Sequence, residues 1–263
     1  MADKRVANAR KAYEKGDLDA TKKAHYHDAF DEHQSHAGHG EYVGDMVYGA
    51  LDGIVTTFAV VAGAAGAGLG PGIVIVLGMA NLIADGLSMA VGNYLSMKSD
   101  SDFYKKEKER EEWEVDHYPD GEREEIRQIY KKKGFAGKNL ETLVELITSK
   151  KTVWVDTMMT DELGLIPSNK SPVKAGLYTY FAFLTAGFIP LVAFVISVFI
   201  PLGENIFPLA FVLTFATIFA VGSLRSLVIS KHWLSAGLEM LLIGGLTAIV
   251  SFLIGSFLGS LVL

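Results

Sequence analysis

Residues 46–69 read MVYGALDGIVTTFAVVAGAAGAGL, an apolar stretch rich in Gly and Ala that contains a single charged residue, Asp52. A helix of about 20 such residues is long enough to cross the ~30 Å hydrocarbon core of a bilayer. Four more long apolar stretches follow, at residues 73–97, 176–200, 206–229 and 233–263. The sequence therefore predicts an all-α membrane protein with five transmembrane helices and the lipid bilayer as its surroundings.

Charged residues are concentrated between the second and third apolar stretches. Residues 98–170 contain 14 Lys and Arg and 17 Asp and Glu, whereas residues 171–263 contain five charged residues. A soluble globule does not confine its charges in this way. We expect four parts: a polar leader at 1–40, transmembrane helices one and two at 41–97, a helical domain at 98–170 that is inserted between helices two and three, and helices three to five at 171–263.

The inserted segment has the pattern of a small helical domain. Residues 118–121 read Tyr-Pro-Asp-Gly, which predicts a turn with Asp120 as the N-cap of the following helix. Gly134 and Gly137 are expected to end that helix. The helices are expected at 105–115, 122–133, 139–148 and 153–163.

Composition excludes several classes of protein. The 263 residues include no Cys, so disulfides, iron–sulfur clusters and thiol catalysis are excluded. The formal net charge of −6 gives a nucleic-acid partner no electrostatic support. The first 40 residues hold no apolar run, so no cleavable signal peptide is expected.

The short loops predict the orientation. The loop at 201–205 carries only Glu204, whereas the loop at 225–231 carries Arg225 and Lys231. Because Lys and Arg accumulate in cytoplasmic loops, the N-terminus and residues 98–170 are expected in the cytoplasm. Five spans then place Leu263 on the far side of the membrane.

Ionisable residues within the apolar stretches are the candidates for function. Asp45 and Asp52 are seven residues apart and share one helix face, and Glu41 extends this line by one turn. In the second stretch, Asp85 and Met89 stand at i and i+4. Such groups are expensive in a membrane and usually face a partner or a polar cavity. The alternative is structural: Asp45 lies at the interface, Asp85 bonds to nearby polar groups, and Met89 fills the core.

The inserted domain repeats the mixture of carboxylates and thioethers. Carboxylates suit hard cations and thioethers suit softer metals, so the mixture favours a divalent transition metal over Mg²⁺ or Ca²⁺. Each acidic pair is also compatible with a solvated helix face, because Lys and Arg are interleaved. Clustered His residues can bind metal too, but the leader is equally consistent with a plain polar segment. The candidates are the pairs Glu111 and Glu114, and Glu122 and Glu125; the set Met158, Met159 and Glu162; and the leader residues His25, His27, His33, His36 and His39.

Three segments resemble the vacuolar iron transporter family, including its bacterial members. They are YGALDG at 48–53, LSMAVG at 87–92 and VDTMMTDELGL at 155–165. The resemblance extends over about residues 41–263. It implies a homodimer of five-span protomers, a cytoplasmic metal-binding domain, and an ion path between the protomers through which Fe²⁺ leaves the cytosol in exchange for protons.

The resemblance also assigns residues. The membrane aspartate and methionine of the family match Asp52 and Met89, with Asp45 and Glu41 nearer the cytoplasmic mouth. Asn81 and Asn93 stand where plant members often have glutamate. The cytoplasmic metal ligands of the family match Glu111, Glu114, Glu122, Glu125, Met158, Met159 and Glu162.

We therefore expect a transporter and not an enzyme, without a bound cofactor. The predicted function is proton-coupled export of Fe²⁺, and of Mn²⁺ or Co²⁺ as further substrates, across the bacterial cell membrane, with a vacuolar membrane as the alternative. A rival interpretation is a membrane-anchored carboxylate ferroxidase. A second is a metal store or sensor without transport, which leaves Asp52 and Met89 unexplained.

Overall fold

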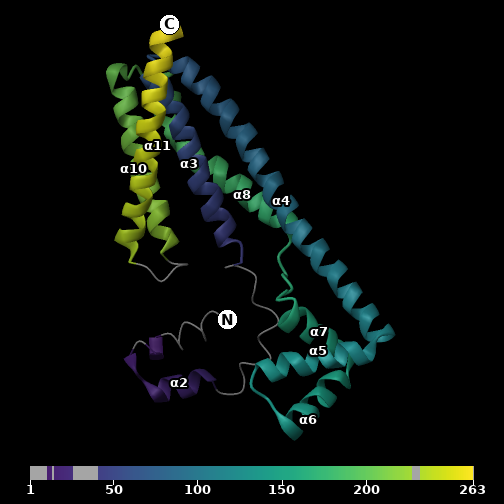
Figure 1. Cartoon of the computed structure of the whole chain (residues 1–263). Coiled ribbons are helices and arrows are strands. Elements are labelled where there is room, and N and C mark those ends of the chain that lie inside the picture. The colour runs from purple at the N-terminus through teal and green to yellow at the C-terminus, as the bar shows by residue number, and fades with distance from the viewer. Residues whose placement is uncertain (1–10, 14, 26–40, 227–231, 263) are drawn as a thin grey trace. The chain divides into compact units, whose positions relative to one another are not determined.

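The structure is a computed structural model that describes residues 11–13, 15–25, 41–226 and 232–262. It divides the chain into two compact units: unit 1 comprises Met1–Asn93 and Val173–Leu263, and unit 2 comprises Tyr94–Pro172. The elements in chain order (Figure 1) are α2 (Leu18–His25), α3 (Val43–Gly66), α4 (Pro71–His117), α5 (Pro119–Lys132), α6 (Gly137–Thr148), α7 (Lys151–Thr157), the π-helix η3 (Met158–Glu162), α8 (Pro172–Gly187), the 3₁₀ helix η4 (Ile189–Leu191), α9 (Val192–Ser197), the 3₁₀ helix η5 (Gly203–Asn205), α10 (Ile206–Arg225) and α11 (Trp233–Val262).

Five segments are long and apolar enough to cross a membrane. Each contains a window of high mean hydropathy with at most two charged residues. In the described part of the chain, the predicted all-α class with five spans is therefore confirmed. The segments are Val43–Gly66, Pro71–His117, Pro172–Ser197, Gly203–Arg225 and Trp233–Leu261.

Helix α3 lies at the centre of unit 1, against α8, α10 and α11 (Figure 1). A Cβ atom built on Gly53 would lie 3.0 Å from the Cα atom of Phe183 in α8 and closer still to its carbonyl oxygen. Further along α3, a Cβ built on Gly259 of α11 would lie 2.8 Å from the Cα atom of Ala67. Small residues thus let the backbones touch, as is common between membrane helices.

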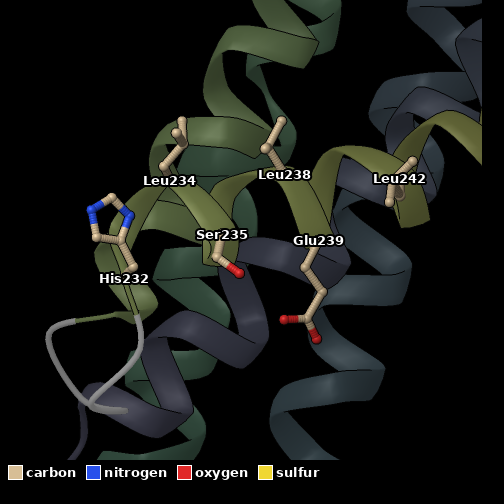
Figure 2. Close-up of a pocket in the computed structure, with 6 residues that line it drawn as sticks. All are labelled: His232, Leu234, Ser235, Leu238, Glu239 and Leu242. Atoms are coloured by element: carbon tan, nitrogen blue, oxygen red, sulfur yellow. The ribbon is translucent and has the colours of Figure 1, made fainter.

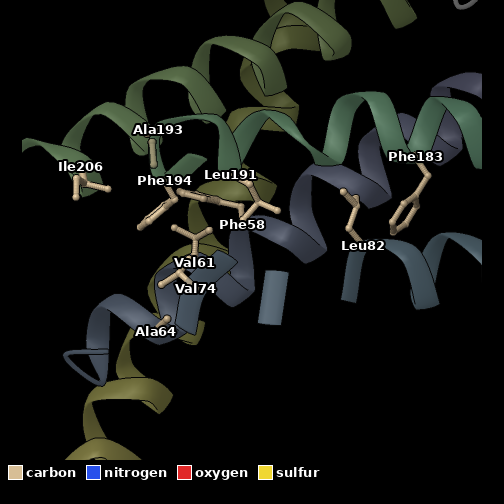
Figure 3. Packing of buried hydrophobic residues seen from close by; sticks show 11 residues of the cluster. Phe58, Val61, Ala64, Val74, Leu82, Phe183, Leu191, Ala193, Phe194 and Ile206 are labelled. Atoms are coloured by element: carbon tan, nitrogen blue, oxygen red, sulfur yellow. The ribbon is translucent and has the colours of Figure 1, made fainter. Parts of the chain in front are cut away.

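Aromatic and aliphatic side chains fill the remaining space in unit 1. Phe58 of α3 is buried and meets the rings of Phe211 and Phe215 edge to face, with centroids 5.2 Å and 5.4 Å away. Leu191 and Phe194 cover the same core from η4 and α9 (Figure 3). The core places α3 firmly among the other spans and so fixes the carboxylates that it carries.

The structure corrects two local predictions. Helix α4 continues unbroken from Pro71 to His117, so the helix expected at 105–115 is the C-terminal part of the helix that forms the second span. No Gly or Pro interrupts residues 93–117, and a change from apolar to charged side chains does not by itself stop a helix. Residues 118–121 are not a free turn, because α5 begins at Pro119 and Asp120 lies in its first turn instead of capping it. Proline suits the first helical position, since its missing N–H needs no partner there.

Unit 2 has its own apolar core. Ile126 of α5, Val144 of α6 and Trp154 of α7 are buried together, and Met158 and Met159 of η3 join them. In the leader, His25 ends α2, while His27, His33, His36 and His39 lie outside the described residues, as does Lys231 of the 225–231 loop.

We predict opposite effects from two Gly-to-Ala changes in α3. Gly53→Ala should destabilise the protein by about 1–3 kcal/mol, because the new methyl group overlaps the α8 backbone. Gly44→Ala should stabilise it by about 0.5–1 kcal/mol, because a Cβ there meets no atom within 4 Å and alanine favours the helix. Thermal unfolding in detergent measures both. Equal melting temperatures for the two variants would contradict the close α3–α8 contact.

Candidate metal centre

Three carboxylates converge in unit 2. Glu111 and Glu114 are three residues apart on α4 and therefore share a face, and Glu122 projects from the first turn of α5. One oxygen atom from each of the three lies within 4.8 Å of the others. Two helices thus bring acidic groups together at the spacing that a single cation can bridge.

Two of these carboxylates are buried with an oxygen that has no hydrogen-bond partner. Glu111 is 1% exposed and Glu122 is 5% exposed. The Oε2 atom of each is buried and accepts no hydrogen bond. A buried, unpaired carboxylate oxygen is costly, so these atoms indicate a place for a ligand that supplies positive charge. For these two residues, the solvated-face interpretation is wrong.

Arg110 balances part of the negative charge. Its guanidinium contacts Glu111 Oε1 at 2.7 Å and Glu114 Oε2 at 2.6 Å. It also donates a 3.0 Å hydrogen bond to Glu107. The ion pair satisfies one oxygen of Glu111 and leaves the other for a cation.

Two further acidic residues contribute to the same electric field. Burial raises the pKa of Glu122 to about 7, and the charges of Glu125 and Glu111 act in the same direction. Burial also raises the pKa of Glu162, followed by the charge of Glu125. Glu125 and Glu162 keep more contact with solvent than Glu111 and Glu122, so they form the rim of the cluster. Carboxylates from α4, α5 and η3 therefore act on one another, whereas metal binding by them stays a prediction.

Met158 and Met159 occupy a π-helical turn and are buried in the apolar core of unit 2. Their neighbours in that core include Val115, Ile126 and Trp154. The structure thus shows them as packed side chains, and ligation through sulfur stays a prediction. A π-helical turn is rare and often marks a functional site.

The predicted membrane residues lie in unit 1. Asp45 and Asp52 are half-buried on α3, and Glu41 is half-buried in the turn before it. Asp52 is close enough to Asp85 of α4 for their charges to interact. Met89 packs, partly buried, against the core of unit 1.

The sequence marks Asn93 only as a position where plant members often have glutamate, and its contacts come from the structure. Its side-chain amide donates hydrogen bonds to Asp45 Oδ1 at 3.0 Å and to Thr179 Oγ1 at 2.8 Å. The feature of the sequence that places Asn93 near the predicted ion-binding residues is its position four residues after Met89, on the same face of α4. Thr179 carried no signal, because nothing in the sequence places α8 beside α3.

A separate pocket of about 510 Å³ lies at the start of α11 (Figure 2). None of the predicted metal residues lines it. Arg225 of α10 reaches Glu239 in its wall at 3.7 Å. The lining residues are His232, Leu234, Ser235, Leu238, Glu239 and Leu242.

The five candidate spans and the buried acidic cluster define a multi-pass membrane protein with a carboxylate site suited to a divalent cation. The chain belongs to the VIT family, whose profile matches residues 43–256. It is 33% identical over 267 residues to the vacuolar iron transporter of Plasmodium berghei, covering 98% of both chains. It is 36% identical over 264 residues to that of Toxoplasma gondii, covering 95% of this chain and 87% of the relative. It is 30% identical over 220 residues to vacuolar iron transporter 1 of Arabidopsis thaliana, covering 83% and 87%.

We predict that Glu122→Gln stabilises the metal-free protein at pH 8 and has little effect at pH 5. The folded pKa of about 7 lies above the ordinary value of 4.5, so the folded protein holds more protons than the unfolded chain between these values. Stability contributed by this group is therefore lost as the pH rises through that window, by about 3 kcal/mol in full.

Thermal unfolding in detergent with a chelator, followed by tryptophan fluorescence, to which Trp154 in the core of unit 2 contributes, measures the effect. Glu145→Gln is the control, because Glu145 is an exposed carboxylate on α6. A Glu122→Gln variant that melts with wild type at both pH values would show that this carboxylate carries no burial cost.

Proposed function

We propose that the chain is a homodimeric transporter that moves Fe²⁺ out of the cytosol in exchange for protons, with Mn²⁺ and Co²⁺ as further substrates. The observation that carries the proposal is the pair of buried, unpartnered oxygens of Glu111 and Glu122 in a chain with five candidate spans. Membership of the VIT family and relatives named vacuolar iron transporters support iron as the ion.

Unit 2 would act as the cytoplasmic metal-binding domain, taking in residues 98–170. Its acidic cluster would collect the ion through Glu111, Glu114 and Glu122, with Glu125 and Glu162 at the rim. Met158 and Met159 would add sulfur ligands that select transition metals over Mg²⁺ and Ca²⁺.

In the membrane, Asp52 and Met89 would bind the ion as it crosses, with Glu41 and Asp45 at the cytoplasmic end. Carboxylates must lose their protons before they bind metal, so each binding event releases protons and exchange follows. The pKa of Glu122 near 7 supports such exchange at physiological pH. The proposed location is the cell membrane of a bacterium, and the names of the relatives favour the alternative, a vacuolar membrane.

The ferroxidase and storage alternatives predict no transmembrane flux. A ferroxidase would consume O₂ when Fe²⁺ is added to the purified protein, and a store would retain metal without moving it. Relatives named as transporters favour transport over both. Fe²⁺ uptake into proteoliposomes with an imposed pH gradient, without matching O₂ consumption, separates the three.

We predict that Asp52→Asn reduces Fe²⁺ flux in proteoliposomes to the level of protein-free vesicles. The amide has almost the same volume but carries no charge for the cation. Glu204→Gln, which removes an exposed carboxylate from the 3₁₀ helix η5, should leave flux unchanged. Wild-type flux from a well-folded Asp52→Asn protein would remove Asp52 from the ion path.

We predict that Met89→Leu lowers Fe²⁺ flux about tenfold, which corresponds to ~1.4 kcal/mol of lost binding free energy. Leu and Met are close in volume, so packing is preserved while the sulfur is lost. Met79→Leu is the control, because Met79 also lies on α4 and packs partly buried against the same core. An unchanged ratio of Fe²⁺ to Mg²⁺ uptake in Met89→Leu would contradict sulfur ligation.

A further inference from the structure

Three spans meet through one amide in unit 1. Asn93 of α4 donates one hydrogen bond to the carboxylate of Asp45 in α3, at 3.0 Å, and a second to the hydroxyl of Thr179 in α8, at 2.8 Å. Thr179 is fully buried. Neither Asn93 nor Thr179 belongs to the ion-binding residues that the sequence predicts.

The hydrogen atoms of this network can be accounted for. The single hydroxyl hydrogen of Thr179 points to a backbone carbonyl, either that of Ala175 at 3.0 Å, one turn back in α8, or that of Asp45 at 3.5 Å. A lone pair of the hydroxyl oxygen is therefore available to accept from Asn93. Both amide hydrogens of Asn93 are then used. Rotating the amide by 180° would place its oxygen against the Asp45 carboxylate, so only one orientation satisfies the network.

The backbone around Asp45 is held on both sides. Three residues before it, the ring of Tyr42 stacks on Tyr178 of α8 with centroids 5.0 Å apart. Four residues after it, a Cβ built on Gly49 would lie 3.1 Å from the Cα atom of Thr179 and closer to its carbonyl oxygen. Helices α3 and α8 therefore cannot shift independently at this level, and Asn93 joins α4 to both.

We propose that Asn93 and Thr179 are positioning residues that fix the Asp45 carboxylate in the orientation in which it receives the transported cation. Thr179 locks the amide of Asn93, and Asn93 in turn orients Asp45. An amide donor brings no positive charge, so it aligns the carboxylate without neutralising it. A Lys or Arg in its place would neutralise the carboxylate. This inference rests on the proposed transport of a divalent metal.

The test compares variants by Fe²⁺ uptake into proteoliposomes over a range of Fe²⁺ concentrations. Thr179→Val removes the hydroxyl at almost constant volume, and Asn93→Leu removes the donor. Groups that orient metal ligands typically change metal affinity 10- to 100-fold when they are replaced. We expect both variants to raise the KM for Fe²⁺ by about tenfold at similar maximal rate, and Thr179→Ser to restore the wild-type KM.

Thr214→Val is the matched control. Thr214 is also fully buried, and its hydroxyl bonds to the carbonyl one turn back, Ala210, at 2.7 Å. It lies on α10, away from the Asp45 network, so its KM should stay at the wild-type value. A similar rise in KM for Thr214→Val and Thr179→Val would reduce the effect to general packing and overturn the proposal.

A double variant shows whether the effect passes through Asp45. If it does, the double variant with Asp45→Asn and Thr179→Val has the same KM as the single variant Asp45→Asn. A further tenfold rise in the double variant would overturn the positioning role, as would a wild-type KM in Thr179→Val alone. Absence of flux from wild-type protein is a different result: it would overturn the proposed function itself, and this inference with it.

Discussion

The contact of α3 with its neighbours, backbone against backbone, is the constraint on which the rest of unit 1 depends. Gly49 and Gly53 leave no room for a side chain where α3 crosses α8, and Gly255 of α11 leaves none against the backbone of Gly63 in α3. Asp52 stands directly before one of these glycines. Because membrane helices gain little from hydrophobic burial against each other, such close contact is what holds them in register. The positions of the acidic groups in the membrane thus follow from the absence of side chains beside them.

Unit 2 meets a different constraint, since its core contains charge. Glu111 and Glu122 are buried, and Arg110 compensates part of the charge of Glu111. A protein that keeps unpaired carboxylate oxygens away from water gives up stability when no cation is bound. Any cation that binds the folded unit and not the unfolded chain returns that stability by mass action. Occupancy and stability of the unit are therefore coupled.

The spans could be predicted because hydropathy over about 20 residues is a property of the sequence alone. The continuity of α4 across residue 97 could not, because the prediction read a change in side-chain polarity as a break in the backbone. The acidic pairs were recognised, yet their spacing is the same for a solvated face and for a buried cluster. What decides is how α5 packs in unit 2, against α6 and η3, and this buries Glu122 but leaves Glu125 exposed. The partnership of Asn93 with Thr179 likewise depends on a helix crossing that no local pattern encodes.

The π-helical turn at Met158–Glu162 has a consequence for the length of the chain. The N–H of Leu163 bonds to the carbonyl of Met158 at 3.1 Å, five residues back, so the turn holds one residue more than an α-helical turn. Gly164, with a φ of +67°, then ends the helix. Deleting one residue here would restore an α-helical turn and rotate Glu162 by about 100° around the helix axis. A homologue one residue shorter at this point would therefore present its carboxylate in another direction, even if every residue type in the turn were kept.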